Sequence, residues 1–265
     1  MSVTTSDLHV EAAGDGPAVV LVHAGICDAR MWDPQWETFP RSHRVLRYDL
    51  RGFGRSPIGE GRFSHARDLL ELLEQQELQK ASLVGVSLGG RVALEAAIAR
   101  PELVEALVLV GAGLPGHDWS AEMDAADEAE AAAVARGDLD AAVEVTLRTW
   151  VDGPRRRPED VDPEVRAQVA EMQRRAYELQ LPVWETAEEE LLVSDLSDRI
   201  GEVGAPTLVV VGEEDVPDMH EIAGKLEREL PNARHASIAD TAHVPSLERP
   251  REFDQVVLPF LQSAQ

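Results

Sequence analysis

The 265-residue chain has one cysteine, few basic side chains and no long apolar run, and each shortage excludes a class of protein. Cys27 alone cannot form an internal disulfide or a thiolate-rich metal site. With 25 Lys and Arg against 49 Asp and Glu, the formal charge is -24, which repels nucleic-acid phosphates and anionic lipid headgroups. The longest apolar stretch, Ala18 to Cys27, is about half as long as a membrane-spanning helix. We therefore expect neither nucleic acid nor a membrane as a partner.

Targeting signals are also missing from the N-terminus. The first ten residues, MSVTTSDLHV, contain no basic stretch followed by an apolar run, so they do not resemble a secretory signal peptide. The hydrophobic fraction of 44% and the charged fraction of 28% are ordinary for a folded protein, and the length fits one large domain with an insertion. The composition predicts a folded cytoplasmic protein.

What the sequence does contain is an alternation of short apolar runs and longer helical patterns, before residue 113 and again after Ala205. Such runs are typical of parallel strands that are buried on both faces. Between and after them, helices are predicted at His65 to Leu78, Leu88 to Arg100 and Pro250 to Leu261. The five clearest runs are Ala18 to His23, Val45 to Asp49, Ser82 to Val86, Ala106 to Val110 and Thr207 to Val211. This order predicts a parallel sheet with helices on both faces.

The segment from Leu114 to Ile200 differs in composition from the rest of the chain. It lacks β-type runs, is rich in Ala and Glu, and carries 22 acidic residues against 9 arginines, among them the cluster Arg155 to Arg157. Ser120, Gly137, Asp138 and the pair Asp162-Pro163 are typical of helix ends. We predict an all-helical insertion whose charges are mostly solvated helix faces.

Four large aromatic side chains interrupt this polar insertion: Trp119, Trp150, Tyr177 and Trp184. Such side chains combine a large apolar body with one polar group, so they suit both a ligand pocket and a packed core. The sequence leaves both interpretations open.

A candidate nucleophile lies in the segment Gly85-Val86-Ser87-Leu88-Gly89, which matches G-x-S-x-G between a predicted strand and a predicted helix. A tight turn at this place lifts a serine hydroxyl above the sheet edge and needs small neighbours, while the amide end of the helix favours developing negative charge. A glycine-rich structural turn is the alternative. The position between strand and helix favours Ser87 as a nucleophile.

A serine hydroxyl needs a base and a third group that fixes the base. Asp215 follows the late strand, at the edge where open parallel sheets bind ligands, although Glu213, Glu214 and Asp218 are alternatives nearby. His243 lies on a loop between a predicted strand, Arg234 to Ile238, and the last helix. The order Ser, Asp, His is the one expected for this architecture. We therefore predict a triad of Ser87, Asp215 and His243.

The remaining histidines are less suitable as a base. Six of them are expected on the surface or in helices, namely His9, His43, His65, His117, His220 and His235. His23 is expected to orient the loop that follows an early strand. The sequence therefore leaves His243 as the candidate base.

The oxyanion that forms during acyl transfer needs two amide donors. The backbone N–H of Leu88, directly after the nucleophile, is the first candidate. The second is the N–H of Gly25, in the loop His23-Ala24-Gly25-Ile26, where a simple glycine turn is the alternative. These two amides complete the predicted site.

Taken together, these segments resemble the α/β-hydrolase superfamily. The resemblance rests on His23 to Gly25, DLRGFGRS at Asp49 to Ser56, GVSLGG at Gly85 to Gly90, GEED at Gly212 to Asp215, and the His243 loop with LERP at Leu247 to Pro250. It implies a mostly parallel, eight-stranded α/β-hydrolase sheet over residues 1–113 and 201–265, with a helical lid inserted at residues 114–200. It also implies a serine hydrolase that uses no cofactor or metal, and a structural role for DLRGFGRS.

Within the superfamily, Met31 to Gln35 and DLRGFGRS are similar to small-molecule carboxylesterases and to 3-oxoadipate enol-lactonase-like enzymes. An enol-lactonase needs cationic groups for the carboxylate of its substrate. Arg148, Arg174 or Arg175 in the acidic insertion could supply them.

The resulting functional prediction is hydrolysis of a small, largely apolar carboxylic ester or lactone through an acyl-enzyme on Ser87. The same triad could instead hydrolyse a C–C bond or act as a perhydrolase, since one scaffold hosts many chemistries. A non-catalytic ligand-binding protein of this fold is the third interpretation. The sequence predicts no particular oligomeric state.

Overall fold

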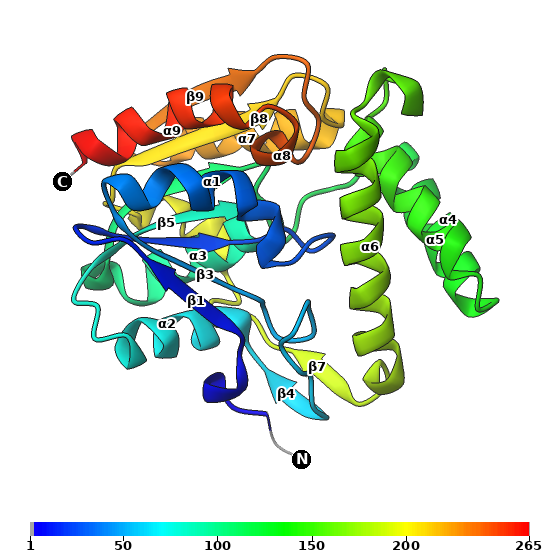
Figure 1. Cartoon of the computed structure of the whole chain (residues 1–265), viewed down its shortest axis with the longest axis horizontal. Coiled ribbons are helices and arrows are strands. Elements are labelled where there is room, and N and C mark those ends of the chain that lie inside the picture. Colours follow the sequence, from blue (N-terminus) through cyan, green and yellow to red (C-terminus); the bar gives the residue numbers. More distant parts are fainter. Residues whose placement is uncertain (1–2, 265) are drawn as a thin grey trace.

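The structure is a computed structural model that describes residues 3–264, and its centre is a mostly parallel sheet (Figure 1). Seven strands from these residues form it in the order β1-β3-β2-β5-β6-β8-β9, with β1 antiparallel to β3 and the other neighbours parallel. The strands are β1 (Val10–Ala13), β2 (Ala18–Val22), β3 (Arg44–Tyr48), β5 (Ala81–Val86), β6 (Val104–Val110), β8 (Thr207–Gly212) and β9 (Ala233–Ile238). Every strand predicted from the sequence is present.

Helices cover both faces of the sheet, as predicted. They are α1 (Asp33–Thr38), α2 (His65–Gln75), α3 (Leu88–Ala99), α7 (Pro217–Glu229), α8 (Pro245–Glu248) and α9 (Pro250–Ser263), with short 3-10 turns at Thr5–Asp7, Ala29–Trp32, Phe39–Arg41 and Pro101–Leu103. Because consecutive side chains of a strand point to opposite faces, Val20 and Val22 of β2 pack with α2, α3 and α7, whereas Val19 and Leu21 pack with α1 and α9. Burial of each such side chain contributes about 1.5–3 kcal/mol, so the apolar runs fix the sheet between two helical layers.

The resemblance implied eight strands in the main sheet, whereas the described residues form seven. Upstream of β1 the chain makes the 3-10 turn Thr5–Asp7 instead of an outer strand. The carboxylate of Asp7 accepts hydrogen bonds from the backbone N–H and the hydroxyl of Thr4 at 2.8 and 2.9 Å. Within the turn, the N–H groups of Asp7 and Leu8 donate to the carbonyls of Thr4 and Thr5 at 3.0 and 3.2 Å, so among the described residues β1 is the outermost strand at that end.

Between β6 and β8 the chain leaves the sheet and forms mainly helices. They are α4 (Ala121–Ala135), α5 (Leu139–Thr146), a π-helical turn (Leu147–Asp152), α6 (Pro163–Gln180) and 3-10 turns at Pro158–Asp160, Leu181–Val183, Leu196–Asp198 and Ile200–Glu202. The side chains of Ser120, Asp138 and Asp162 accept backbone N–H groups at the starts of α4, α5 and α6. Gly137, just beyond α4, has a φ of 73°. The predicted helix ends are therefore confirmed.

The expectation of an entirely helical insertion is wrong, because the segment contains a strand. β7 (Ala187–Glu189) pairs in parallel with β4 (Gly61–Phe63) in a separate two-stranded sheet. Arg62 of β4 forms ion pairs with Glu188 and Glu190 at 3.3 and 2.7 Å, and all three side chains are exposed. A strand whose side chains are solvated on both faces needs no alternation of apolar and polar residues. The acidic residues of β7 therefore carry no sequence pattern that indicates a strand.

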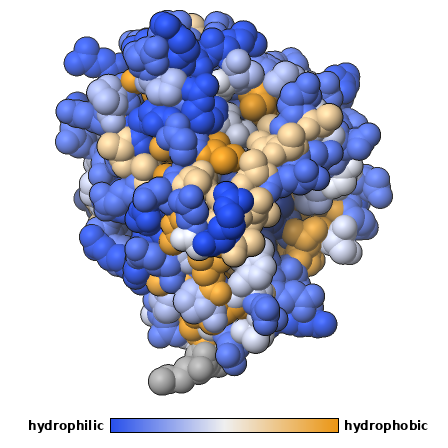
Figure 2. All heavy atoms as spheres, turned by 90° about the vertical axis from the view of Figure 1, so that its right-hand side faces the viewer, coloured by the Kyte–Doolittle hydropathy of each residue, from blue (hydrophilic) through white to orange (hydrophobic). Residues whose placement is uncertain are grey.

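The helices of the insertion stand beside the carboxyl ends of the parallel strands, at the right of Figure 1. α6 reaches the loops that follow β2 and β3, where Gln168 donates to the carbonyl of Arg30 at 3.2 Å and Gln180 donates to that of Gly52 at 3.1 Å. Seen from this side, the surface is mostly hydrophilic, with hydrophobic residues showing in its middle (Figure 2). Within residues 3–264, no helix combines the length and apolarity needed to cross a bilayer.

Candidate active site

Ser87 lies in the turn between β5 and α3, where the sequence predicts a nucleophile. Its backbone has φ 53° and ψ -114°, a conformation that is strained for a residue with a side chain. Two hydrogen bonds hold the turn: the N–H of Ser87 donates to Val110 O at 2.9 Å, and the N–H of Gly113 donates to Ser87 O at 3.1 Å. Ser87 is also the N-cap of α3, so it stands at the positive end of the helix dipole.

This turn is possible because its neighbours are glycines. A Cβ atom on Gly85 would overlap the carbonyl of Gly89, and a Cβ atom on Gly89 would overlap the carbonyl of Val22. A Cβ atom on Gly90 would lie 2.6 Å from the Cβ of Ala112. The start of α3 therefore packs directly against the backbone around it, which explains the GVSLGG segment.

Asp215 and His243 are in direct contact. Asp215 follows β8, and His243 lies in the loop between β9 and α8. Nδ1 of His243 donates to Oδ2 of Asp215 at 2.8 Å, while Oδ1 of Asp215 accepts the N–H of Val216 at 2.9 Å. Each of the two side chains is 1% exposed. Because Nδ1 carries the proton of this bond, Nε2 is the nitrogen that can accept another.

Nε2 of His243 is buried and forms no hydrogen bond with any residue that the structure describes. The carbonyl of Val110 accepts the N–H of Ser87, and Gly111 is the next residue in the chain. A Cβ atom on Gly111 would lie 3.0 Å from Nδ1 of His243 and 3.2 Å from Oδ2 of Asp215. Ser87 thus stands at the strand end next to the pair, without a hydrogen bond to His243. Hydrogen bonds between catalytic groups often tighten only when the substrate binds.

The acidic neighbours of Asp215 are occupied elsewhere. The carboxylate of Asp218 accepts hydrogen bonds from the N–H and the hydroxyl of Ser120, both at 2.8 Å, and so fastens the start of α4. Glu214 forms an ion pair with an arginine of the insertion at 2.8 Å, and Glu213 is exposed. Asp215 is therefore the one of these four carboxylates that binds the histidine.

His23 orients the loop after β2, as expected. Its Nδ1 donates to Ala24 O and its Nε2 accepts the N–H of Leu50, both at 2.8 Å. Burial is the main reason that its pKa is lowered, so the ring stays neutral between two backbone groups. A histidine with both nitrogens bound in this way has no free position for a substrate proton.

The expectation that the other histidines lie on the surface or in helices is wrong for His43, which is buried just before β3. His65 lies in α2, as expected, but only 4% of it is exposed. Burial, with a smaller contribution from Arg91, lowers the pKa of His65 to about 3. A single sequence cannot distinguish a buried helical histidine from an exposed one when the residues around it are mixed.

The two predicted amide donors come from loops that touch. A Cβ atom on Gly25 would lie 3.5 Å from the Cβ of Leu88. Leu88 is the first residue of α3, so its N–H has no carbonyl partner within the helix. The loop of Gly25 is closed by the N–H of Cys27, which donates to Ala24 O at 3.0 Å. Free amides at a helix start are suited to an oxyanion.

The DLRGFGRS segment ties two loops together. Asp49 accepts the N–H of Ala29 on one carboxylate oxygen and the N–H of Arg55 on the other, both at 2.8 Å. Its carbonyl accepts the hydroxyl of Ser56 at 2.6 Å. Gly54 has a φ of 52°, and a Cβ atom there would overlap the Asp49 carboxylate. These bonds explain the segment as a support for the loops beside the site.

The four aromatic residues of the insertion divide between the two predicted roles. Trp150 packs on His243 with ring centroids 4.4 Å apart, and Trp119 packs edge-to-face on Trp150 at 6.5 Å. Tyr177 is buried in the second apolar core, together with other helices of the insertion. Trp184 is 69% exposed and lines a cavity. Trp119, Trp150 and Tyr177 are therefore packed against other side chains, whereas Trp184 lines a cavity.

This cavity has a volume of about 410 Å³, and Leu88 forms part of its wall, so the cavity lies beside the turn of Ser87. Its volume suits a small ligand. Two charged residues of the wall already have partners: Arg51 binds Asp68 at 2.7 Å, and Glu189 binds Arg91 at 2.6 Å. The other wall residues are Phe53, Ile58, Phe63, His65, Gln180, Trp184 and Ala187. Most of the wall is thus apolar or aromatic.

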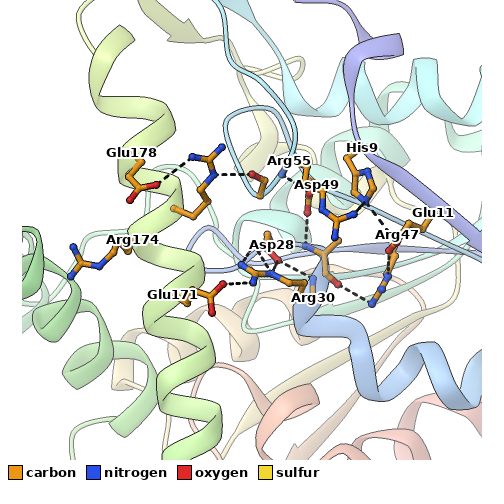
Figure 3. A pocket seen from close by; sticks show the side chains of 13 residues that line it. His9, Glu11, Asp28, Arg30, Arg47, Asp49, Arg55, Glu171, Arg174 and Glu178 are labelled. Atoms are coloured by element: carbon orange, nitrogen blue, oxygen red, sulfur yellow. Dashed lines mark hydrogen bonds and ion pairs between the residues drawn. The ribbon is translucent and has the colours of Figure 1, made fainter.

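The three arginines proposed for a substrate carboxylate lie outside this wall. Arg148 pairs with Asp152 at 3.2 Å, and Arg174 pairs with Asp140. Arg174 and Arg175 belong instead to a second cavity of about 390 Å³, where α6 faces acidic and basic residues of the core (Figure 3). In Figure 3, Arg174 extends from α6 towards α5.

Sequence reasoning missed the polar residues around the first cavity. Arg91, one helical turn after Ser87, binds Glu95 at 2.5 Å in addition to Glu189 on β7. The position of Arg91 just after the G-x-S-x-G motif is the one feature of the sequence that could indicate a place near the site. The sequence around His65 has no such feature. Within residues 3–264, no group of three or more His, Cys, Asp or Glu side chains is arranged to hold a metal ion.

Known proteins resemble this chain in sequence and in fold. Residues 17–250 match the sequence model of a family described as the alpha/beta hydrolase fold. A pimeloyl-[acyl-carrier protein] methyl ester esterase from Nitrosospira multiformis is 27% identical, and the match covers 93% of this chain and 95% of that protein. The 3-oxoadipate enol-lactonase 1 of Acinetobacter baylyi is 22% identical, with 98% and 94% covered. The solved structure of a thermophilic esterase from Thermogutta terrifontis has a TM-score of 0.78 and 26% identity, with 97% of this chain and 93% of that chain covered.

The similarity to esterases and to an enol-lactonase confirms the resemblance that the sequence motifs indicated. The family match runs from the first residues of β2 to the start of α9, and therefore includes the loops of Gly25, Ser87, Asp215 and His243. The chain belongs to the α/β-hydrolase fold family.

Proposed function

We propose that this protein is a serine hydrolase that cleaves a small, largely apolar carboxylic ester or lactone through an acyl-enzyme on Ser87. The observation that carries the proposal is the 2.8 Å hydrogen bond between His243 and Asp215, at the strand ends next to Ser87. It leaves Nε2 of His243 as the nitrogen that can accept the serine proton. The relatives named as an esterase and an enol-lactonase support the same class of bond.

In the proposed reaction, Oγ of Ser87 attacks the carbonyl carbon while its proton moves to Nε2 of His243. The negative charge on the carbonyl oxygen is bound by the N–H groups of Gly25 and Leu88. His243 then gives the proton to the leaving oxygen as the C–O bond breaks. A water molecule then gives a proton to His243 and attacks the acyl carbon; the bond from that carbon to Oγ breaks, His243 returns the proton to Oγ of Ser87, and the carboxylic acid leaves. Throughout, Asp215 keeps the proton on Nδ1 and stabilises the imidazolium form.

The cavity beside Leu88 supports an uncharged substrate. Arg51 is held by Asp68 and also donates to the carbonyl of Val3 at 2.8 Å, and Glu189 is held by Arg91. A substrate carboxylate would find no unpaired cation in the described wall. The helical insertion supplies Gln180, Trp184, Ala187 and Glu189 to this wall, so we assign it the role of a lid.

The first test replaces the nucleophile. Ser87→Ala should reduce turnover of p-nitrophenyl acetate and butyrate by at least about 10³-fold, because the acyl-enzyme cannot form. Its far-UV circular dichroism should match that of the natural protein. Ser237→Ala, at an exposed serine of β9, is the matched control and should keep full activity. Undiminished turnover by purified Ser87→Ala would refute the assignment of the nucleophile.

A second test addresses the alternative functions. A fluorophosphonate should label the natural protein once, on Ser87, whereas a folded protein that stays unlabelled would favour a ligand-binding role. Parallel assays should give faster turnover of esters or lactones than of vinylogous diketones, and little peracid formation. A dominant diketone or peracid activity would replace ester hydrolysis as the function.

A further inference from the structure

Trp150 of the insertion contacts His243 with both its side chain and its backbone. The ring centroids are 4.4 Å apart and the ring planes are inclined by 39°. The backbone N–H of His243 donates to the carbonyl of Trp150 at 3.1 Å. Because the side chain of His243 is 1% exposed, Trp150 forms part of the wall that separates this imidazole from water.

The backbone around Trp150 is built for this contact. Trp150 lies in the π-helical turn Leu147–Asp152, a rare conformation that occurs most often at functional sites. Gly153 follows with a φ of 72°, and a Cβ atom there would overlap the carbonyl of Glu214 and lie 3.3 Å from the Cβ of Ala242. The chain that leaves the π-turn therefore passes directly between the loop of Asp215 and the loop of His243.

Arg156 fastens the same turn to the His243 loop. Its guanidinium donates to the carbonyls of Val151 and Asp152 in the π-turn at 2.6 and 2.9 Å. It also donates to the carbonyl of Asp240, three residues before His243, at 2.9 Å. Arg156, in the basic cluster Arg155 to Arg157, thus links the insertion to the loop of His243.

Glu248 completes this link from α8. Its carboxylate pairs with Arg156 at 2.7 Å and accepts the N–H of Ala242, next to His243, at 2.7 Å. The side chains of Glu248 and Arg156 are 5% and 13% exposed. The loop of His243 is therefore held at Asp240, Ala242 and His243 by groups that also hold the π-turn.

We propose that Trp150 is a positioning residue for His243: its indole face fixes the plane of the imidazole and stabilises the imidazolium formed when the base accepts a proton. The inference rests on the proposed role of His243 as that base. Asp215 holds the ring at a single atom, about which the ring can tilt, and the face of Trp150 limits this tilt. An aromatic face also attracts a cation, most strongly where water is excluded.

Other charged groups act on His243 as well and must be kept constant in any test. Asp215 lies at its Nδ1 edge, while Glu248 on α8 and Arg156 from the insertion form a pair of opposite charges beside its loop. Asp240 in the loop itself is exposed and lies 3.8 Å from Arg249. None of these groups changes when Trp150 is replaced, so a change in the protonation of His243 then reports on the indole.

The experiment compares Trp150→Leu and Trp150→Phe with the natural protein in ester hydrolysis. Trp150→Leu should lower kcat by about 10- to 30-fold with little change in KM, and should move the acid limb of the kcat/KM profile to lower pH by about 0.5–1 unit. The direction follows because the imidazolium loses a stabilising partner and deprotonates more readily. Trp150→Phe keeps an aromatic face and should restore most of both quantities.

Trp184→Leu is the matched control, since Trp184 is a tryptophan of the insertion that lines the cavity. It should raise KM and leave the acid limb in place. The proposal is overturned if Trp150→Leu keeps its acid limb within about 0.2 pH units and its kcat within about threefold of the natural values.

A measurement that needs no turnover separates this inference from the proposed function. The ring protons of His243 can be followed by NMR during a pH titration of the natural protein and of Trp150→Leu. A lower titration midpoint in the variant supports the inference even if no ester is hydrolysed, whereas an unchanged midpoint overturns it. Failure of the proposed function would show instead as an absence of fluorophosphonate labelling in the natural protein.

Discussion

Oδ2 of Asp215 and Nδ1 of His243 lie 2.8 Å apart at a place where each side chain is 1% exposed. The partners come from loops after two adjacent strands, β8 and β9, which pair in register from Thr207 to Gly212. In a site that excludes water, a carboxylate beside the imidazole both orders the ring and stabilises its charged form. The pairing of β8 with β9 thus brings the carboxylate of Asp215 to Nδ1 of His243.

Asp215→Asn should therefore reduce kcat/KM for esters by about 10³- to 10⁴-fold, because an amide can hold the imidazole in the wrong tautomer. The overall structure should survive, since the two side chains are nearly the same size. Activity assays and a thermal melt of the same preparation check this expectation. A loss of less than about tenfold would contradict the role of Asp215.

Asp218→Asn is the matched control for that variant. Asp218 lies three residues further on and caps α4 through Ser120, without contact to His243. Its replacement should cost about 1 kcal/mol of stability through the weakened cap and leave ester turnover within about tenfold. If Asp218→Asn were inactive while Asp215→Asn stayed active, the choice between the two carboxylates would have to be reversed.

The tight turn at Ser87 predicts that a larger residue at Gly89 strongly destabilises the fold. A Cβ atom there would overlap the carbonyl of Val22 and lie 2.6 Å from that of His23, and no side-chain rotation can relieve a clash with backbone. Gly89→Ala should thus lose more than about 3 kcal/mol of unfolding free energy. Gly204→Ala, where no atom lies within 4 Å of the new Cβ, should stay within about 1 kcal/mol. Urea unfolding of the three proteins decides between these outcomes.

How much of this molecule can be predicted from its sequence depends on the environment of each element. The strands β2, β5, β6 and β8 are buried on both faces, and such continuous apolar runs are unambiguous. β1, β4 and β7 are partly or fully exposed, and their sequences VEAA, GRF and AEE carry no alternation to detect. Solvated backbone pairing leaves no hydrophobic signal, so these three strands could not be predicted.

The site shows the same division. Residues after strand ends meet at one edge of a parallel sheet whatever surrounds them, so the contact of Asp215 with His243 follows from topology. The stacking of Trp150 on His243 depends on a π-helical turn, and one residue fewer in that turn would rotate the indole away. No sequence rule specifies such a turn. The stacking of Trp150 on His243 thus requires the structure, whereas the contact of Asp215 with His243 could be predicted.

The exposed indole of Trp184 predicts an effect on substrate binding. It is 69% exposed and forms part of the cavity wall, so an apolar acyl group packed against it would lose contact area when the ring is removed. Trp184→Ala should raise KM for p-nitrophenyl hexanoate about fivefold, for a loss of roughly 1 kcal/mol, and change that for the acetate less. Trp36→Ala, a tryptophan outside the wall, is the comparison. An equal effect on both esters would place the acyl group elsewhere.

The buried histidine of the cavity predicts a pH dependence of stability. Burial lowers the pKa of His65 to about 3, whereas the ordinary value in an unfolded chain is 6.5. Between these two pH values the unfolded chain binds a proton that the folded protein does not, so the free energy of unfolding falls as the pH decreases through this window. From pH 7 to pH 5 the contribution of His65 to this fall is about 2 kcal/mol. Above about pH 7, His65 is neutral in both states, so its share of the fall is absent there.

His65→Leu isolates this contribution from that of other groups, such as His23, whose pKa is lowered by burial in the same direction. The difference between the unfolding free energies at pH 7 and pH 5, measured in urea, should be about 2 kcal/mol smaller in the variant. His220→Gln, at a half-buried position of α7, should leave the difference nearly unchanged. An unaltered pH dependence in His65→Leu would mean that His65 becomes protonated within the folded protein, and that the cavity beside Leu88 admits water and a charge.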